Sequence, residues 1–135
     1  MDRAKVLIID DEEELVTTLL ERMQMRGLPA EGVLNGKDGL HRLAEGGFDV
    51  VVLDLMIPGF SGQQVLQTIR EKFPAVRVLL ITGHGADPES EAHLQPGAGD
   101  ILLKPFRIET MIEKIADLRK NRSLPDSEAD QGKLT

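Results

Sequence analysis

The sequence predicts an α/β fold: a doubly wound, five-stranded parallel sheet in the order 2-1-3-4-5, with helices on both faces. Short apolar runs alternate with amphipathic stretches along the chain. The runs are continuous rather than alternating, as in strands that are covered on both faces. Polar residues follow the first, third, fourth and fifth runs. Because the carboxyl ends of parallel strands meet at one edge of the sheet, we expect these residues to converge there.

Three strands and two helices are expected in the first half of the chain. The strands cover Lys5–Asp10, Ala30–Leu34 and Val50–Leu53. The first helix has one apolar stripe, which consists of Leu15, Val16, Leu19, Leu20 and Met23. Gly27 is expected to end this helix, because glycine readily adopts the left-handed conformation found after a helix. The second helix covers roughly 37–45, and Gly46-Gly47 interrupts the chain after it.

Two strands and two well-defined helices are expected in the second half. A helix begins near Ser61, a good cap residue, and the last helix has apolar residues at helical spacing from Ile108 to Leu118. The strands cover Val76–Ile81 and Ile101–Leu103. Between Pro88 and Gln95 there are only two apolar residues, so the fourth helix is expected to be short, loosely packed or partly disordered.

The length of 135 residues fits one domain. We place this domain at 1–119, and we expect a flexible C-terminal tail or linker stub at 120–135. The tail is charged, contains Pro125 and lacks apolar periodicity. No separate output domain fits after the last helix, so we expect either a single-domain protein or a domain cut from a longer chain.

Composition excludes several kinds of function. The net charge of −7 argues against direct binding to nucleic acid or anionic membranes. The absence of cysteine excludes disulfides, thiolate metal sites and thiol catalysis. No apolar run reaches membrane-spanning length, and the first residues lack a secretory pattern. We therefore expect a cytoplasmic protein.

Acidic residues at two strand ends predict a magnesium site. Asp10 and Asp11 end the first apolar run, and Asp54 ends the third. Three crowded carboxylates repel one another, and a hard divalent cation would relieve that repulsion. Oxygen ligands without cysteine favour Mg²⁺, which keeps several waters for incoming phosphate oxygens.

Donor groups at the other strand ends predict phosphoryl chemistry at the same place. Lys104 supplies a positive charge, Thr82 a hydroxyl, and Gly83 a backbone N–H that is open to approach. Together with a metal, these groups can neutralise the oxygens of a transferring phosphoryl group. Asp54 is then the natural nucleophile, and its product is an acyl phosphate.

Each of these residues also has an ordinary structural interpretation. Asp10 and Asp11 could cap the first helix, and Asp54 could accept hydrogen bonds from the turn that follows it. Lys104 could be a solvated strand end, and Thr82 could be structural. Their coincidence at successive strand ends favours one shared site.

The order Asp10-Asp11, Asp54, Thr82-Gly83 and Lys104-Pro105-Phe106 resembles the receiver domain of two-component response regulators. The resemblance covers roughly residues 4–118 and includes the flavodoxin-like strand order. It implies a phosphorylation-controlled switch that catalyses only its own phosphorylation and hydrolysis, and is otherwise not an enzyme. The phosphoryl donor would be a histidine kinase or a histidine phosphotransfer protein.

The resemblance also implies a role for each site residue. Asp54 corresponds to the phosphoacceptor, Asp11 to the direct magnesium ligand, and Asp10 to the ligand that acts mainly through water. The backbone carbonyl of Met56 completes the protein ligands. Lys104 corresponds to the lysine that contacts the phosphoryl group, and Thr82 to the hydroxyl that moves toward it. The peptide bond before Pro105 is expected to be cis.

The chain departs from the family pattern at three places. Many receivers carry a switching aromatic residue where this chain has Ile101, which we expect to be a core residue instead. The polar segment 84–97 suggests a response by an order–disorder change. Met56 and His84 flank the expected water path, and an apolar Met56 should slow the self-hydrolysis.

Two other functions compete with the receiver function. An aspartate-nucleophile phosphatase of the haloacid dehalogenase type would need a second aspartate where this chain has Met56. An unphosphorylated interaction module, a pseudo-receiver, would act by constitutive protein docking. The phosphoryl donor is expected to dock near the first helix, where Glu13 and Thr17 could contribute, whereas Leu20 and Met23 are expected in the core. The protein is expected to be a monomer or a phosphorylation-dependent dimer with an unidentified downstream target.

Overall fold

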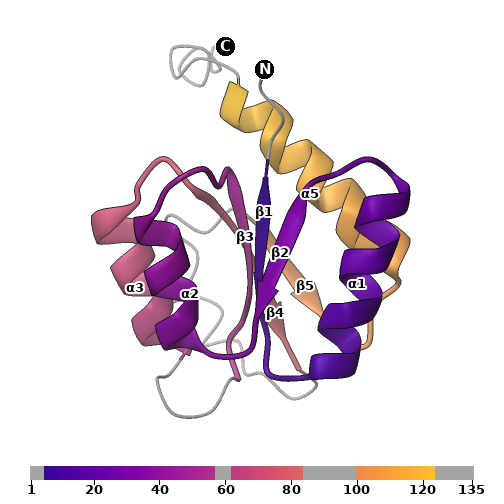
Figure 1. Cartoon of the computed structure of the whole chain (residues 1–135), viewed down its shortest axis with the longest axis horizontal. Helices are drawn as coiled ribbons and strands as arrows, with labels where there is room; N and C mark the ends of the chain where they lie inside the picture. The colour runs from indigo at the N-terminus through magenta and orange to yellow at the C-terminus, as the bar shows by residue number, and fades with distance from the viewer. Residues whose placement is uncertain (1–4, 57–61, 84–99, 124–135) are drawn as a thin grey trace.

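The computed structural model describes residues 5–56, 62–83 and 100–123. Five parallel strands form one sheet in the order β2-β1-β3-β4-β5, as predicted (Figure 1). The strands are β1 (Val6–Ile9), β2 (Ala30–Val33), β3 (Val50–Asp54), β4 (Arg77–Thr82) and β5 (Asp100–Leu103). The described helices are α1 (Glu13–Met25), α2 (Gly36–Ala44), α3 (Gly62–Lys72) and α5 (Ile108–Ser123).

Helices cover both faces of the sheet. In Figure 1, α1 and α5 lie on one side of the strands, and α2 and α3 lie on the other. Alternate strand residues point into two separate cores: Val6 and Ile8 pack with α1 and α5, whereas Leu7 and Ile9 pack with α2 and α3. Burial of both faces explains why the strands have continuous apolar sequences.

Helix α1 shows how local sequence sets the frame of the site. Val16, Leu19 and Met23 from the predicted stripe are buried, so Met23 is a core residue as expected. Gly27 follows the helix at φ 71°. The N–H groups of Gly27 and Leu28 donate to the carbonyls of Gln24 (3.0 Å) and Met23 (2.9 Å), which completes a Schellman motif. The expected stop at Gly27 is confirmed.

Some element bounds differ from the prediction. Helix α5 continues through Ser123, so the expected tail is helical over 120–123. The sequence lacks apolar residues there, but it contains good helix formers, and basic residues are favourable at a helix C-terminus. Ser61, the expected fourth helix at 88–95, and the tail from 124 lie outside the described residues.

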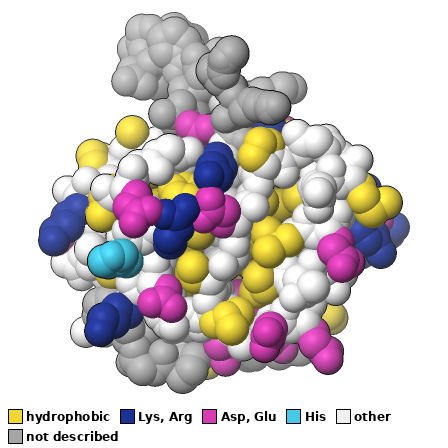
Figure 2. Space-filling model, in the orientation of Figure 1, with side chains coloured by type: hydrophobic (Ala, Val, Ile, Leu, Met, Phe, Trp, Pro, Cys, Tyr) yellow, Lys and Arg dark blue, Asp and Glu magenta, His cyan; other side chains and the backbone are white. Residues whose placement is uncertain are grey.

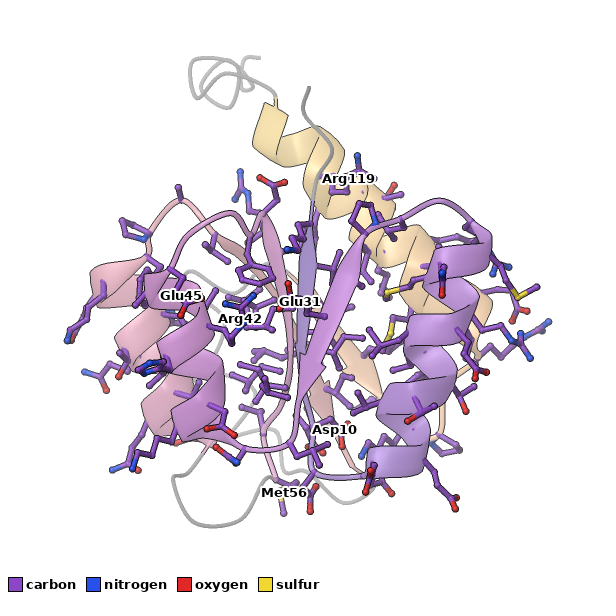
Figure 3. The ribbon with its side chains drawn as sticks, in the orientation of Figure 1. Asp10, Glu31, Arg42, Glu45, Met56 and Arg119 are labelled. Carbon is purple, nitrogen blue, oxygen red and sulfur yellow. The ribbon has the colours of Figure 1, made fainter. Side chains whose placement is uncertain are left out.

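An ion-pair network ties the edge strand β2 to its neighbours. Glu31 accepts from Lys5 Nζ at 2.7 Å and from Arg42 Nε at 3.0 Å, and Arg42 also pairs with Glu45. Hydrogen bonds from Lys5 and then from Arg42 hold the pKa of Glu31 below its ordinary value. Acidic and basic side chains lie next to one another on the α2 side of the face in Figure 2, and Figure 3 labels three of them. The network is structural, because its charges satisfy one another.

No described helix is long and apolar enough to cross a membrane.

Candidate functional site

The predicted residues meet at the carboxyl edge of the sheet. Asp54 and Thr82 are the last residues of β3 and β4, and Asp10 directly follows β1. All three are buried, with exposures of 2%, 2% and 0%. Lys104 directly follows β5. Figure 3 labels Asp10 and Met56 at this end of the molecule, on the opposite end from Arg119.

The two buried aspartates, Asp10 and Asp54, are each held by a local turn of the same kind. Oδ1 of Asp10 accepts the N–H of Glu12 at 2.9 Å, and Oδ1 of Asp54 accepts the N–H of Met56 at 2.9 Å. Aspartate commonly binds the backbone two residues further along in this way. In each residue the second oxygen, Oδ2, faces Lys104. The turn interpretation of Asp54 is therefore correct, and it is compatible with a role in the site.

Asp10 is not the cap of the first helix. The N-cap residue of α1 is Glu12, and its side chain makes no capping hydrogen bond. The pair Asp10-Asp11 precedes the helix and contributes instead to the acidic group.

Asp10, Asp11 and Asp54 form a group that can hold a metal ion. One carboxylate oxygen of each lies within 4.8 Å of the others, with Asp11 exposed and the other two buried. Asp10 Oδ2 is buried and has no hydrogen-bond partner among the described residues. A buried carboxylate oxygen without a donor is costly, and a cation would satisfy it. The donor set therefore fits Mg²⁺.

The raised pKa of Asp10 indicates that its carboxylate lacks enough positive charge nearby. Burial, with a smaller contribution from nearby Asp54, raises the pKa of Asp10 to about 6. The N–H of Glu12 and the ammonium of Lys104 oppose this increase without cancelling it. A divalent cation would favour the charged carboxylate.

Lys104 contacts three carboxylates among the described residues. Its Nζ lies 3.1 Å from Asp54 Oδ2, 2.9 Å from Glu12 Oε1 and 3.8 Å from Asp10 Oδ2. Partial burial acts to lower the pKa of the Lys104 ammonium, but Glu12, Asp54 and Asp10 outweigh it and hold that pKa above its ordinary value. The predicted convergence of Lys104 and the acidic pair on Asp54 is confirmed.

Glu12 is the site residue that the sequence interpretation missed as a lysine partner. A signal was present, because a third acidic residue follows Asp10-Asp11 at the same sheet edge as Lys104. Which of these carboxylates contacts the lysine depends on side-chain direction, which spacing does not specify.

Thr82 and Gly83 line the β4 side of the site. The Thr82 hydroxyl donates to the Gly83 carbonyl at 3.4 Å, a long contact that leaves it available to other acceptors. The backbone N–H of Lys104 donates to the Thr82 carbonyl at 2.8 Å and fixes the end of β5 beside β4. Apart from Gly83 itself and its chain neighbours, no described atom lies within 4 Å of a Cβ placed on Gly83, so the described residues leave its backbone open to approach.

The predictions for the residues that are expected to modulate the site are confirmed for some residues and stay predictions for others. Ile101 packs against the core shared by α2 and α3, as expected for a core residue. The Lys104–Pro105 peptide bond is cis, as expected. Met56 is 72% exposed beside the site. His84 and the segment 84–97, for which an order–disorder change is expected, lie outside the described residues.

Gly62 allows α3 to approach the Asp54 turn closely. A Cβ at Gly62 would lie 2.4 Å from Leu55 Cα and 2.5 Å from the Leu55 carbonyl oxygen. Both are backbone atoms, so they cannot move aside as a flexible side chain would. The absence of a side chain at residue 62 therefore positions the turn that carries Asp54.

A parallel sheet with an acidic group, a threonine and a lysine at its carboxyl edge defines a receiver-type α/β domain. The family model for the response regulator receiver domain matches residues 6–116. The chain belongs to this family.

Curated relatives of the chain are regulatory and sensory transduction proteins. The chain is 37% identical over 122 residues to an uncharacterized transcriptional regulatory protein, YkoG, of Bacillus subtilis, which covers 90% of this chain and 54% of that protein. It is 35% identical over 130 residues to the sensory transduction protein RegX3 of Mycolicibacterium smegmatis, with 96% and 57% covered. The chain thus spans about half the length of these relatives.

Solved structures agree with the fold. A response regulator receiver domain protein from Clostridium thermocellum superposes with a TM-score of 0.83 at 27% identity, covering 90% of this chain and 98% of that one. The response regulator protein TrrA from Thermotoga maritima, solved in complex with Mg²⁺ and BeF, gives 0.74 at 29% identity, covering 85% and 98%. The family assignment, the fold class and the strand order are therefore all confirmed.

Proposed function

We propose that Asp54 accepts a phosphoryl group in a Mg²⁺-dependent reaction and that the chain works as a phosphorylation-controlled switch. The observation that carries this proposal is the convergence of the Lys104 ammonium and the acidic group on Asp54. Its Oδ2 lies 3.1 Å from Lys104 Nζ, and its carboxylate belongs to the group that can hold a cation. The donor would be a histidine kinase or a histidine phosphotransfer protein.

The proposed ligands for magnesium are Asp10, Asp11, Asp54 and the backbone carbonyl of Met56. The ion would screen the negative charge of the carboxylates and of the incoming phosphoryl oxygens. The acidic group and the orphaned Asp10 Oδ2 support this assignment. The relative from Thermotoga maritima was solved with Mg²⁺.

In the proposed reaction a carboxylate oxygen of Asp54 attacks phosphorus, and the bond from phosphorus to the donor imidazole nitrogen breaks. The product is an acyl phosphate on Asp54. Lys104, the Thr82 hydroxyl and the Gly83 N–H would bind the phosphoryl oxygens, because preorganised donors stabilise the charge on them. Water later attacks phosphorus, the bond between phosphorus and the Asp54 oxygen breaks, and inorganic phosphate leaves. Met56, which is exposed, and His84 are proposed to modulate that step.

Treatment with acetyl phosphate and Mg²⁺ followed by intact-mass measurement tests the proposal. We expect the parent to gain one phosphoryl group and Asp54→Asn to gain none. Asp49→Asn is a matched control, because Asp49 precedes the same strand at its opposite end, and it should gain the group as the parent does. A parent that gains no mass, or an Asp54→Asn variant that gains it, would contradict the assignment.

A pseudo-receiver that docks constitutively remains the second candidate. It is favoured by Ile101, which packs against the core and cannot act as a switching aromatic residue. Acquisition of a phosphoryl group by the parent would exclude a silent site. We also propose that residues 1–119 form the receiver domain and that 120–135, of which α5 includes 120–123, form a tail or linker stub.

A further inference from the structure

Glu12 is placed unusually for the residue that caps the start of a helix. It occupies the N-cap position of α1, where a side chain commonly accepts a backbone N–H, but it makes no such bond. Its carboxylate instead contacts Lys104 Nζ at 2.9 Å, across 92 positions of the chain. The side chain therefore serves a tertiary contact at the site rather than its own helix.

Glu12 differs from the other two partners of Lys104. Asp10 and Asp54 are buried and belong to the group that can hold a metal ion, so a cation would compete with Lys104 for them. Glu12 lies outside that group, and its side chain is 58% exposed. Among the described residues it is the nearest partner of the ammonium, and its contact with Lys104 does not involve the carboxylates of the metal group.

An incoming phosphoryl group needs the same ammonium. Lys104 can donate only three hydrogen bonds, and its contacts with Glu12 and Asp54 already use two of them. Glu12 also adds negative charge at the mouth of a site that must attract an anion. The contact between Glu12 and Lys104 therefore competes with phosphoryl binding.

We propose that Glu12 is a positioning residue that holds Lys104 in a resting ion pair and thereby restrains phosphorylation. The proposal rests on the proposed function, because it concerns the same lysine and the same acceptor. Removing the Glu12 charge should free Lys104 for the phosphoryl group. Exposed ion pairs have modest strength, so the expected effect is about two- to five-fold.

The test uses fluoroberyllate, an analogue of the phosphoryl group, in the presence of Mg²⁺. Its affinity for the parent and for Glu12→Gln is measured by ¹⁹F NMR, and thermal melting by circular dichroism checks that both are folded. We expect Glu12→Gln to bind about two- to five-fold more tightly and to be phosphorylated faster by acetyl phosphate by a similar factor. Unchanged or weaker binding would overturn the proposal.

Two controls separate the contact from general electrostatics. Glu14→Gln removes the same charge from an exposed position in the first turn of α1 that has no contact with Lys104, and its affinity should match that of the parent. In a Lys104→Met background, Glu12→Gln should bring no gain. A gain that is equal in Glu14→Gln, or that persists without the lysine, would overturn the proposal.

The outcomes also distinguish this proposal from the proposed function. A parent that binds no fluoroberyllate with Mg²⁺ contradicts both. A parent that binds it, with no gain in Glu12→Gln, contradicts the role of Glu12 alone.

Discussion

At the residue level, the burial of Asp10 has two opposite effects: it destabilises the metal-free fold, and it favours the binding of a cation. Asp10 is fully buried, and one of its oxygens has no hydrogen-bond partner among the residues that the structure describes. Such a group destabilises the metal-free fold, because a buried carboxylate loses its hydration without full compensation. The same property makes the site attract a cation. Stability without metal is thus reduced by the feature that suits the site to its proposed chemistry.

The raised pKa of Asp10 predicts how the stability of the metal-free protein depends on pH. Folding raises this pKa from 3.8 to about 6, so the folded state binds the proton more tightly than the unfolded chain does. The stabilising contribution is present below the unfolded pKa and is lost as pH rises through about 6. Asp10→Asn cannot lose a proton, but it can still accept the Glu12 N–H.

We therefore expect the free energy of unfolding of the parent, relative to Asp10→Asn, to fall by about 1–2 kcal/mol between pH 4 and pH 7. Urea unfolding in EDTA, followed by circular dichroism, measures this difference. Parallel pH profiles for the two proteins would show that Asp10 titrates normally in the folded state.

At the scale of elements, α3 must approach the β3 turn closely to hold Asp54 in place. Gly→Ala in a helix normally stabilises it by about 1 kcal/mol, because alanine has the higher helix propensity. At Gly62 the opposite is expected, because the new Cβ would meet the Leu55 backbone at 2.4 Å. Overpacking against rigid atoms commonly costs about 1–3 kcal/mol.

Gly62→Ala should accordingly lower the free energy of unfolding by about 1–3 kcal/mol and slow phosphorylation by acetyl phosphate, because the turn that carries Asp54 must shift. Gln63→Ala, one residue further along the same helix at an exposed position, should change neither property. A Gly62→Ala protein as stable as the parent would mean that the backbone at Leu55 yields easily.

At the scale of the whole molecule, two apolar cores support a polar edge that a cation would complete. A ligand that binds only the folded state stabilises it by mass action, by about 2.7 kcal/mol at a hundred times its dissociation constant. Mg²⁺ should therefore raise the melting temperature of the parent. It should raise that of Asp11→Asn much less, because one carboxylate of the acidic group is gone.

Thermal melting with and without MgCl₂, at matched ionic strength, measures this difference. Asp117→Asn removes the same charge from an exposed position late in α5 and should respond to Mg²⁺ as the parent does. Equal shifts in all three proteins would indicate a general salt effect instead of a specific site.

Much of the molecule could be predicted because its signals are local or depend on simple topology. Apolar runs bounded by polar residues located the strands, and the spacing of Val16, Leu19 and Met23 located the buried face of α1. The end of α5 was placed too early, because apolar periodicity stops before the helix does. A helix can continue on propensity alone once packing has established it.

Residue patterns were enough to predict the parallel sheet, its order and the meeting of Asp10, Asp54, Thr82 and Lys104 at one edge, because buried strands in this topology end together. The pairing of Glu12 with Lys104 and the position of Gly62 against Leu55 are visible only in the folded molecule. The first contact joins residues far apart in the chain and depends on the directions of two side chains. The second depends on the close approach of two backbone segments. Such details follow from packing in three dimensions, which residue spacing does not encode.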